Sequence, residues 1–237
     1  MPAPPRYRGA YARPVLSQAI GDLLPAAVAV ALSPIPIVAI VIVLGTSRAR
    51  VNGVAFALGW IVGLTAVSAL VVGLLGGSGD GGPSGPSSAL QLVLGLVLLV
   101  PAARKSRTRP HGDSEPEMPG WLASVDHMST ARALALGVAL SAANPKNLAL
   151  TASAAAAIAQ AGLDGADTVL AVATFVVLGS VTVAGAVLAT LVAPRRTAAP
   201  LASIKTFMAR NNAVIMMVIL LVFGAKLVGD GMAGLLS

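Results

Sequence analysis

The sequence predicts an all-α integral membrane protein with six transmembrane helices. Of its 237 residues, 56% are hydrophobic and only 11% are charged, whereas a soluble domain carries about 25% charged residues. The mean hydropathy is +0.86, and the apolar residues form long runs instead of one face of each helix. A soluble core in a chain of this size could not bury such runs, so lipid is the expected solvent.

Six apolar segments account for the predicted spans, because a helix needs about 20 residues to cross the hydrocarbon region. The first and fourth segments are too long for a simple span and contain proline, so we expect both helices to be broken. The third segment is short, but Arg104 and Lys105 follow it and can extend to the interface. The segments are 19–44, 51–75, 88–103, 131–159, 166–193 and 213–236.

The basic residues predict the orientation of the spans. Three loops and their flanks on one side carry eleven of the sixteen basic residues, while the opposite loops, 76–87 and 160–167, carry none. Only the N-terminal arm, with three arginines, opposes this pattern. The positive-inside rule therefore predicts a protein of the cytoplasmic (inner) membrane with both termini outside. The eleven residues are Arg48, Arg50, Arg104, Lys105, Arg107, Arg109, Arg132, Arg195, Arg196, Lys205 and Arg210.

The two halves of the chain resemble each other. Residues 30–33 read Val-Ala-Leu-Ser before Pro34, and residues 138–141 read Val-Ala-Leu-Ser shortly before Pro145. The third span of each half contains a central glycine, Gly95 or Gly224. Because three helices is an odd number, the second unit would enter the membrane in the opposite direction, which predicts two inverted three-helix repeats. We expect an extracytoplasmic arm at 1–18, repeats at 19–103 and 130–237, and a cytoplasmic linker at 104–129.

Several functional classes are disfavoured by composition. The chain has no cysteine, which removes disulfides and thiolate chemistry. His111 and His127 lie in or beside the linker without other ligands, so we expect surface residues and no metal site. The basic residues flank apolar runs, which is not the pattern of a nucleic-acid surface. No histidine lies in a span to act as a base, so we expect no enzyme, no catalytic residues and no cofactor.

Asn144-Pro145-Lys146-Asn147 is the most informative motif. Lys146 lies fourteen residues from Arg132 and thirteen from Ala159, or roughly 20 Å from either end of its span. A lysine at that depth costs at least about 3 kcal/mol, so its ammonium must face protein, water or a counter-ion. Two amides beside a proline break add further polar groups. We interpret the motif as a polar site at the membrane midplane.

Ser33-Pro34-Ile35-Pro36 is the corresponding break in the first span. Each proline removes a backbone donor and frees a carbonyl one turn earlier, and freed groups in lipid need partners. Two interpretations are open: a packing kink satisfied locally by Ser33, or a broken helix that lines a cavity. The predicted transport site comprises Ser33, Pro34, Pro36, Asn144, Pro145, Lys146 and Asn147.

Three further charges lie within the predicted spans. Lys226 and Asp230 are four residues apart and can pair on one helix face, although Gly229-Asp230-Gly231 could instead end the helix. Asp22, near the outer end of the first span, is another possible counter-charge for Lys146. Gly59 and Gly63 form a GxxxG motif, which we expect to serve internal packing instead of dimerisation.

At these residues the sequence resembles the LysE-type transporter superfamily. The likeness is greatest to its GAP family, the glycopeptidolipid- and sulfolipid-addressing proteins of actinobacteria. It extends from about residue 20 to 235 and includes residues 31–37, residues 144–148, and Gly224-Ala225-Lys226 with the glycines around Asp230. The first break lacks the Gly-Pro pairing of the amino-acid exporters in this superfamily, which disfavours an amino-acid substrate.

The resemblance implies a role in moving an envelope glycolipid or a small solute outward across the membrane. One hypothesis is a secondary transporter in which Lys146 binds an anionic or zwitterionic group. A second is an accessory protein of a larger lipid exporter, without its own transport cycle. A third is a divalent-cation exporter, but such a site needs several carboxylates. The expected partners are membrane lipid and the substrate, with no nucleic acid, and a homo-oligomer is compatible with the sequence.

Overall fold

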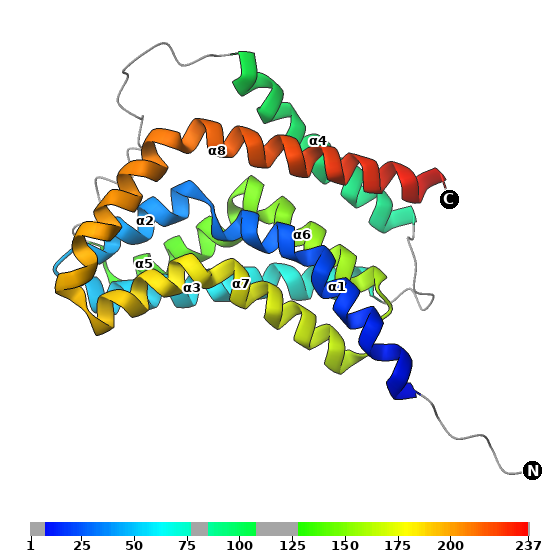
Figure 1. Cartoon of the computed structure of the whole chain (residues 1–237), viewed down its shortest axis with the longest axis horizontal. Helices are drawn as coiled ribbons and strands as arrows, with labels where there is room; N and C mark the ends of the chain where they lie inside the picture. Colours follow the sequence, from blue (N-terminus) through cyan, green and yellow to red (C-terminus); the bar gives the residue numbers. More distant parts are fainter. Residues whose placement is uncertain (1–7, 77–84, 108–127, 237) are drawn as a thin grey trace, which may run out of the picture.

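The computed structural model describes residues 8–76, 85–107 and 128–236, and every element in these ranges is a helix (Figure 1). The prediction of an all-α protein is therefore confirmed for the described residues. The elements are α1 (Arg8–Ala31), α2 (Pro34–Leu44), α3 (Ala49–Leu75), α4 (Gly85–Arg107), α5 (Thr130–Val138), the π-helical turn η2 (Ala139–Ala143), α6 (Pro145–Gln160), α7 (Gly165–Val192) and α8 (Pro194–Leu236).

Several helices are suited to crossing a membrane. By length and hydropathy, α3, α7 and α8 qualify alone, and α1 with α2 qualifies as one span bent by 51°. Ser88–Val100 and Thr130–Ala143 are shorter apolar helices. Large apolar side chains lie exposed along the outside, including Leu70, Val177 and Leu188, as expected for surfaces that contact lipid. The chain is thus a multi-pass membrane protein, whereas the count of six spans stays a prediction.

Two helices begin earlier than the apolar segments indicate. Helix α1 starts at Arg8, inside the predicted N-terminal arm, and α8 starts at Pro194, well before the predicted sixth span. Figure 1 shows that α8 first rises from one end of the molecule and then bends to run beside α4. Its first part therefore lies at that end of the molecule, and its second part corresponds to the apolar segment 213–236.

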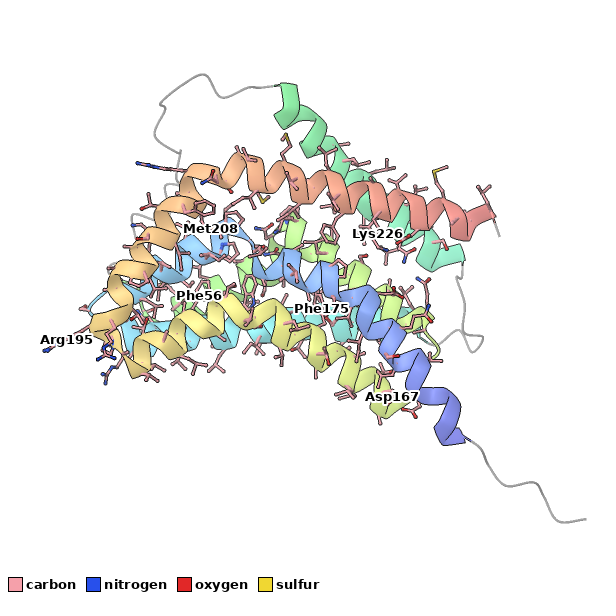
Figure 2. The ribbon with its side chains drawn as sticks, in the orientation of Figure 1. Phe56, Asp167, Phe175, Arg195, Met208 and Lys226 are labelled. Atoms are coloured by element: carbon pink, nitrogen blue, oxygen red, sulfur yellow. The ribbon has the colours of Figure 1, made fainter. Side chains whose placement is uncertain are left out.

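The described carboxylates lie toward one end of the molecule, and the other end, called the basic end, carries Arg48, Arg50, Arg195, Arg196 and Lys205. Consecutive long elements run in alternating directions, so α2 and α7 end, and α3 and α8 begin, at the same end (Figure 1). Arg195 lies at this end and Asp167 at the opposite one (Figure 2). All carboxylates among the described residues lie toward the end with Asp167, namely Asp22, Asp164, Asp167 and Asp230.

Glycine residues allow several pairs of helices to pack closely. Helix α4 lies along α8, α3 packs against α5, α6 and α7, and α1 packs against α6 and α7. A Cβ atom at Gly95 would lie 3.0 Å from the Gly224 carbonyl oxygen, and one at Gly224 would lie 3.2 Å from the Gly95 oxygen. The two central glycines identified in the sequence therefore face each other where α4 meets α8.

The GxxxG motif serves internal packing, as predicted. A Cβ at Gly59 would overlap the backbone carbonyl of Leu134, and one at Gly63 would overlap the Ser141 hydroxyl. Gly137 makes the reciprocal contact, because its Cβ would overlap the carbonyl of Phe56. Since small residues let helix backbones approach closely, these glycines hold α3 against α5 and η2. This contact fixes the helix that leads to Lys146.

Candidate functional site

The first helix break leaves two backbone carbonyls without their usual partners. In a continuous helix Ser33 N–H would bond to the Ala29 carbonyl, but it donates to the Val30 oxygen instead, at 3.2 Å. Pro34 then occupies the first turn of α2, with Ser33 as its N-terminal cap residue. The carbonyls of Ala29 and Ala31 are therefore free to accept bonds from side chains elsewhere, because a buried carbonyl without a donor is costly.

The second break is built differently. The π-helical turn brings Asn144 N–H to the Ala139 oxygen at 3.1 Å, and Pro145 begins α6. The Asn144 side-chain oxygen caps α6 by accepting from Lys146 N–H at 3.1 Å. Because Pro145 has no N–H, the Leu140 carbonyl one π-turn earlier is freed. The Asn147 side-chain amide donates to that carbonyl at 2.8 Å.

The two breaks are joined by hydrogen bonds. The Lys146 Nζ donates to the Ala29 carbonyl at 2.9 Å and to the Ser33 hydroxyl oxygen. The Ser33 hydroxyl in turn donates to the Asn147 Oδ1 at 2.7 Å. The exposed fractions of Ser33, Lys146 and Asn147 are 2%, 3% and 0%. The structure thus brings together the two motifs from opposite halves of the sequence in one closed polar cluster.

The remaining predicted residues shape the cluster without joining its bonds. Pro34 and Pro36 are buried in the first turn of α2, and Pro145 opens α6. Neither break is the purely local kink that Ser33 alone could satisfy. The side chains of Lys146 and Asn147, both in the first turn of α6, each bond to a freed carbonyl, one at each break.

The cluster is positively charged when Lys146 is in its ammonium form. Its hydrogen-bond partners within the described residues are an oxygen of Ala29 and one of Ser33, and neither is a carboxylate. Helices α2 and α6 both begin here, and helix N-termini carry partial positive charge. The ammonium has three N–H donors, of which two are used by these partners. A cation beside two helix N-termini is suited to contact with an anion.

Sequence reasoning missed one member of the site. The Thr182 hydroxyl on α7 donates to the freed Ala31 carbonyl at 2.6 Å. Together with Lys146, it supplies side-chain donors to two carbonyls at the first break, those of Ala29 and Ala31. A threonine in the middle of an apolar span was the available signal, since polar residues there usually face protein.

The predicted counter-charges gather elsewhere. Asp22, Lys226 and Asp230 line a pocket of about 630 Å³ between α1, α6 and α8, and Gln91 from α4 also lines it. Lys226 and Asp230 form the predicted ion pair, with side chains 51% and 42% exposed. Helix α8 continues through Gly229 and Gly231, so these glycines do not end it. Asp22 lines this pocket, and the ion pair recorded among the described residues does not include it.

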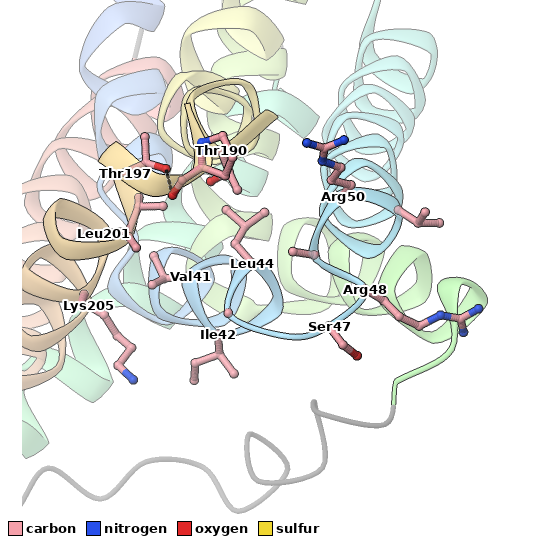
Figure 3. Close-up of a pocket in the computed structure, with 16 residues that line it drawn as sticks. Val41, Ile42, Leu44, Ser47, Arg48, Arg50, Thr190, Thr197, Leu201 and Lys205 are labelled. Carbon is pink, nitrogen blue, oxygen red and sulfur yellow. Dashed lines mark hydrogen bonds between the residues drawn. The ribbon is translucent and has the colours of Figure 1, made fainter. Parts of the chain in front are cut away.

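A second pocket of about 740 Å³ lies at the basic end (Figure 3). The two pockets lie on either side of the closed cluster along the broken first span. Helix α1 lines the 630 Å³ pocket as far as Ala26, one turn before Ala29. Helix α2 lines the 740 Å³ pocket from Val41 onward, about 12 Å of helix beyond Ser33. The Lys146 cluster therefore separates two pockets that lie toward opposite ends of the molecule.

The comparison with known proteins yields one match. A family model described as "Sap, sulfolipid-1-addressing protein" matches residues 23–233. No curated protein and no solved structure matches the chain significantly. The matched range includes both helix breaks, the Lys146 cluster, all residues that line the 740 Å³ pocket and twelve of the seventeen that line the 630 Å³ pocket.

Proposed function

This chain belongs to the sulfolipid-1-addressing protein family, and on that premise we propose that it moves an anionic envelope lipid outward across the cytoplasmic membrane. The observation that carries the proposal is the buried Lys146 between two pockets. A carrier needs a binding group that can be reached from either side in turn but not from both sides at once. The place of the Lys146 cluster along the broken first span, between one pocket toward each end, supports this assignment.

The charge of the cluster supports an anionic ligand. A sulfate, phosphate or carboxylate group can accept the remaining ammonium donor and also interact with the positive ends of α2 and α6. Such a group would supply the counter-charge that neither Asp22 nor Asp230 provides. A neutral or cationic ligand would leave the ammonium uncompensated in a low-dielectric region, which is costly.

Two features of the packing support the inverted repeat that this mechanism uses. In an inverted repeat the first span is equivalent to the fourth, and the second to the fifth. A contact between the first and fifth spans therefore implies one between the fourth and second. Both are present, since α1 packs against α7 and α3 packs against α5 and α6. Gly95 and Gly224, at equivalent places in the halves, face each other, as residues near a two-fold axis would. We therefore infer two three-helix units, 19–103 and 130–237, joined by the linker 104–129.

The inferred topology has both termini outside and the linker inside. Since the chain has no cysteine, single cysteines report accessibility without background. We expect Ser84→Cys to react with an impermeant thiol reagent in intact cells and Ser114→Cys to react only after the membrane is opened. The reverse labelling pattern would contradict the orientation and the inverted repeat together.

Reconstitution tests the transport proposal. Purified full-length protein in liposomes should move tail-labelled phosphatidylglycerol between leaflets, measured by dithionite quenching, while labelled phosphatidylcholine stays at the protein-free rate. The anionic lipid serves as a chemical probe for the natural substrate. If the protein moves neither lipid although it is folded and inserted, the transporter assignment fails and an accessory role in a larger lipid exporter is favoured.

A further inference from the structure

The 740 Å³ pocket at the basic end combines an apolar wall with cationic residues. Its wall includes Val41, Ile42 and Leu44 from the end of α2, together with Leu201 from α8. The volume lies within the range of about 300–1,000 Å³ typical of small-molecule sites. One side of the pocket is therefore suited to hydrocarbon and its edge to a charged group.

The cations around this pocket have no carboxylate partner among the described residues. Arg48, Arg50 and Lys205 line the pocket, and no acidic residue does. The ion pair recorded in the described part of the chain is Lys226 with Asp230, in the other pocket. Figure 3 shows Arg50 and Lys205 on opposite sides with Leu44 between them, while Arg48 extends outward from the rim. Arginine is the side chain best suited to bidentate contacts with phosphate or sulfate.

The surroundings of the pocket favour a lipid over a soluble anion. The first part of α8 carries exposed Ile204 and Phe207 beside the pocket-lining Lys205. Leu201, four residues before Lys205, shares its helix face and lines the pocket, so a ligand whose headgroup contacts the cations would have its acyl chains beside Leu201 and the apolar end of α2.

We propose that this pocket binds the anionic headgroup of a membrane lipid from the adjacent leaflet. Basic residues that only orient a membrane protein need to lie in the loop, and they do not need to line a cavity. Here Arg50 and Lys205 lie on opposite sides of one cavity with an apolar wall, and Arg48 lies at its rim. The proposal deepens the proposed function by assigning a first binding site, but binding at this pocket does not require that Lys146 transport anything.

Native mass spectrometry of the full-length protein in detergent tests the pocket directly. We expect bound phosphatidylglycerol in wild type and little bound phosphatidylcholine. The triple variant Arg48→Gln/Arg50→Gln/Lys205→Gln should bind phosphatidylglycerol about ten- to a hundredfold more weakly, because each cation near a lipid surface contributes to the attraction. Every variant is first checked for wild-type helix content and a single elution peak.

Arg195→Gln/Arg196→Gln is the matched control, since both arginines are exposed at the same end but do not line the pocket. This control should bind phosphatidylglycerol with an affinity within about twofold of the wild-type value. Equal losses in the control and the pocket variant would mean a general surface-charge effect and would overturn the proposal. Wild-type binding by a folded pocket variant would overturn it as well.

Two further arms identify the occupant. Glycerol phosphate at equal concentration should not displace the lipid, and full displacement would indicate a site for soluble anions instead. Asp113→Asn/Glu115→Gln/Glu117→Gln should leave lipid affinity unchanged. A large gain in affinity would instead make the acidic linker the natural occupant of the pocket and would overturn the proposal. The triple variant should weaken phosphatidylglycerol binding by the same factor in a Lys146→Met background, whatever that background does to lipid movement, so a failure at the pocket is distinguishable from a failure of the transport proposal.

Discussion

Lys146 and Lys226 both lie in predicted membrane spans, but they are stabilised by different means. Lys226 is about half exposed and pairs with Asp230 one turn along the same continuous helix. Lys146 is 3% exposed, and its described partners are a hydroxyl and a backbone carbonyl from a helix more than 100 residues earlier in the chain. Lys226 is therefore paired within its own helix, whereas Lys146 depends on tertiary structure for its partners.

This difference shows what a helix break contributes beyond a bend. A continuous helix has no spare carbonyl to offer, so a lysine in it needs a carboxylate or water. The break at Ser33 frees the Ala29 carbonyl, and that oxygen becomes a partner for Lys146. The proline break and the buried lysine are therefore two parts of one arrangement, and disturbing either should affect the other. A change at Lys226 should affect little beyond its own ion pair with Asp230.

The largest effect is expected for Lys146→Met. Methionine keeps the approximate length and apolar volume but removes the ammonium, so transport of an anionic lipid should fall by about 100-fold, corresponding to about 3 kcal/mol for a charge-assisted hydrogen bond. Stability should change little, because relief of desolvation offsets the unpaired Ala29 carbonyl. Lipid movement in liposomes and a thermal melt measure the two quantities. Normal transport by this variant would refute the site, and Lys146→Arg should not rescue it, since a planar guanidinium fills the space differently.

Asn147→Leu should have the next largest effect, and on stability first. It removes the donor to the Leu140 carbonyl and leaves the Ser33 hydroxyl with only the longer 3.4 Å bond to the Ala29 oxygen, which should cost about 1–3 kcal/mol. Chemical unfolding in detergent measures this loss. Asn211→Leu is the matched control, because Asn211 also bonds a backbone carbonyl but at an exposed position. Similar losses for both asparagines would show that the link between the breaks has no special importance.

The smallest effect is expected for Lys226→Met. An exposed pair at four-residue spacing contributes about 0.2–0.5 kcal/mol, so stability should fall by no more than that amount. Lipid movement should fall only mildly, because Lys226 lines the pocket without contacting the Lys146 cluster. The same melt and liposome assays apply. A loss of transport equal to that of Lys146→Met would remove the distinction between the two lysines.

Local sequence patterns predicted the features that depend on one helix. Proline positions gave both breaks, four-residue spacing gave the Lys226–Asp230 pair, and the GxxxG motif gave close internal packing. Each of these follows from the geometry of a single helix. The membership of the family was also apparent from the residues around the breaks and near Asp230.

Features that depend on packing between spans were not predictable. Nothing local indicates that Lys146 meets Ala29 or that Thr182 meets Ala31. The repeated Val-Ala-Leu-Ser strings also mislead, because they align Ser33 with Ser141. In the structure Ser33 is the N-cap residue of α2, but the N-cap residue of α6 is Asn144, which lies three residues after Ser141. Helix caps are set by the prolines that follow them, and the π-helical turn separates the second string from its proline.

The isolated position of Lys146 also has an electrical consequence. In its ammonium form it is a single charge inside the membrane, and moving one charge through the full field costs or releases about 2.3 kcal/mol per 100 mV. An anion bound to Lys146 would make a neutral pair, so the loaded protein could change conformation with little electrical work. The empty protein would carry the charge back alone. Membrane voltage should then act on the return step of the cycle and leave the loaded step nearly unaffected.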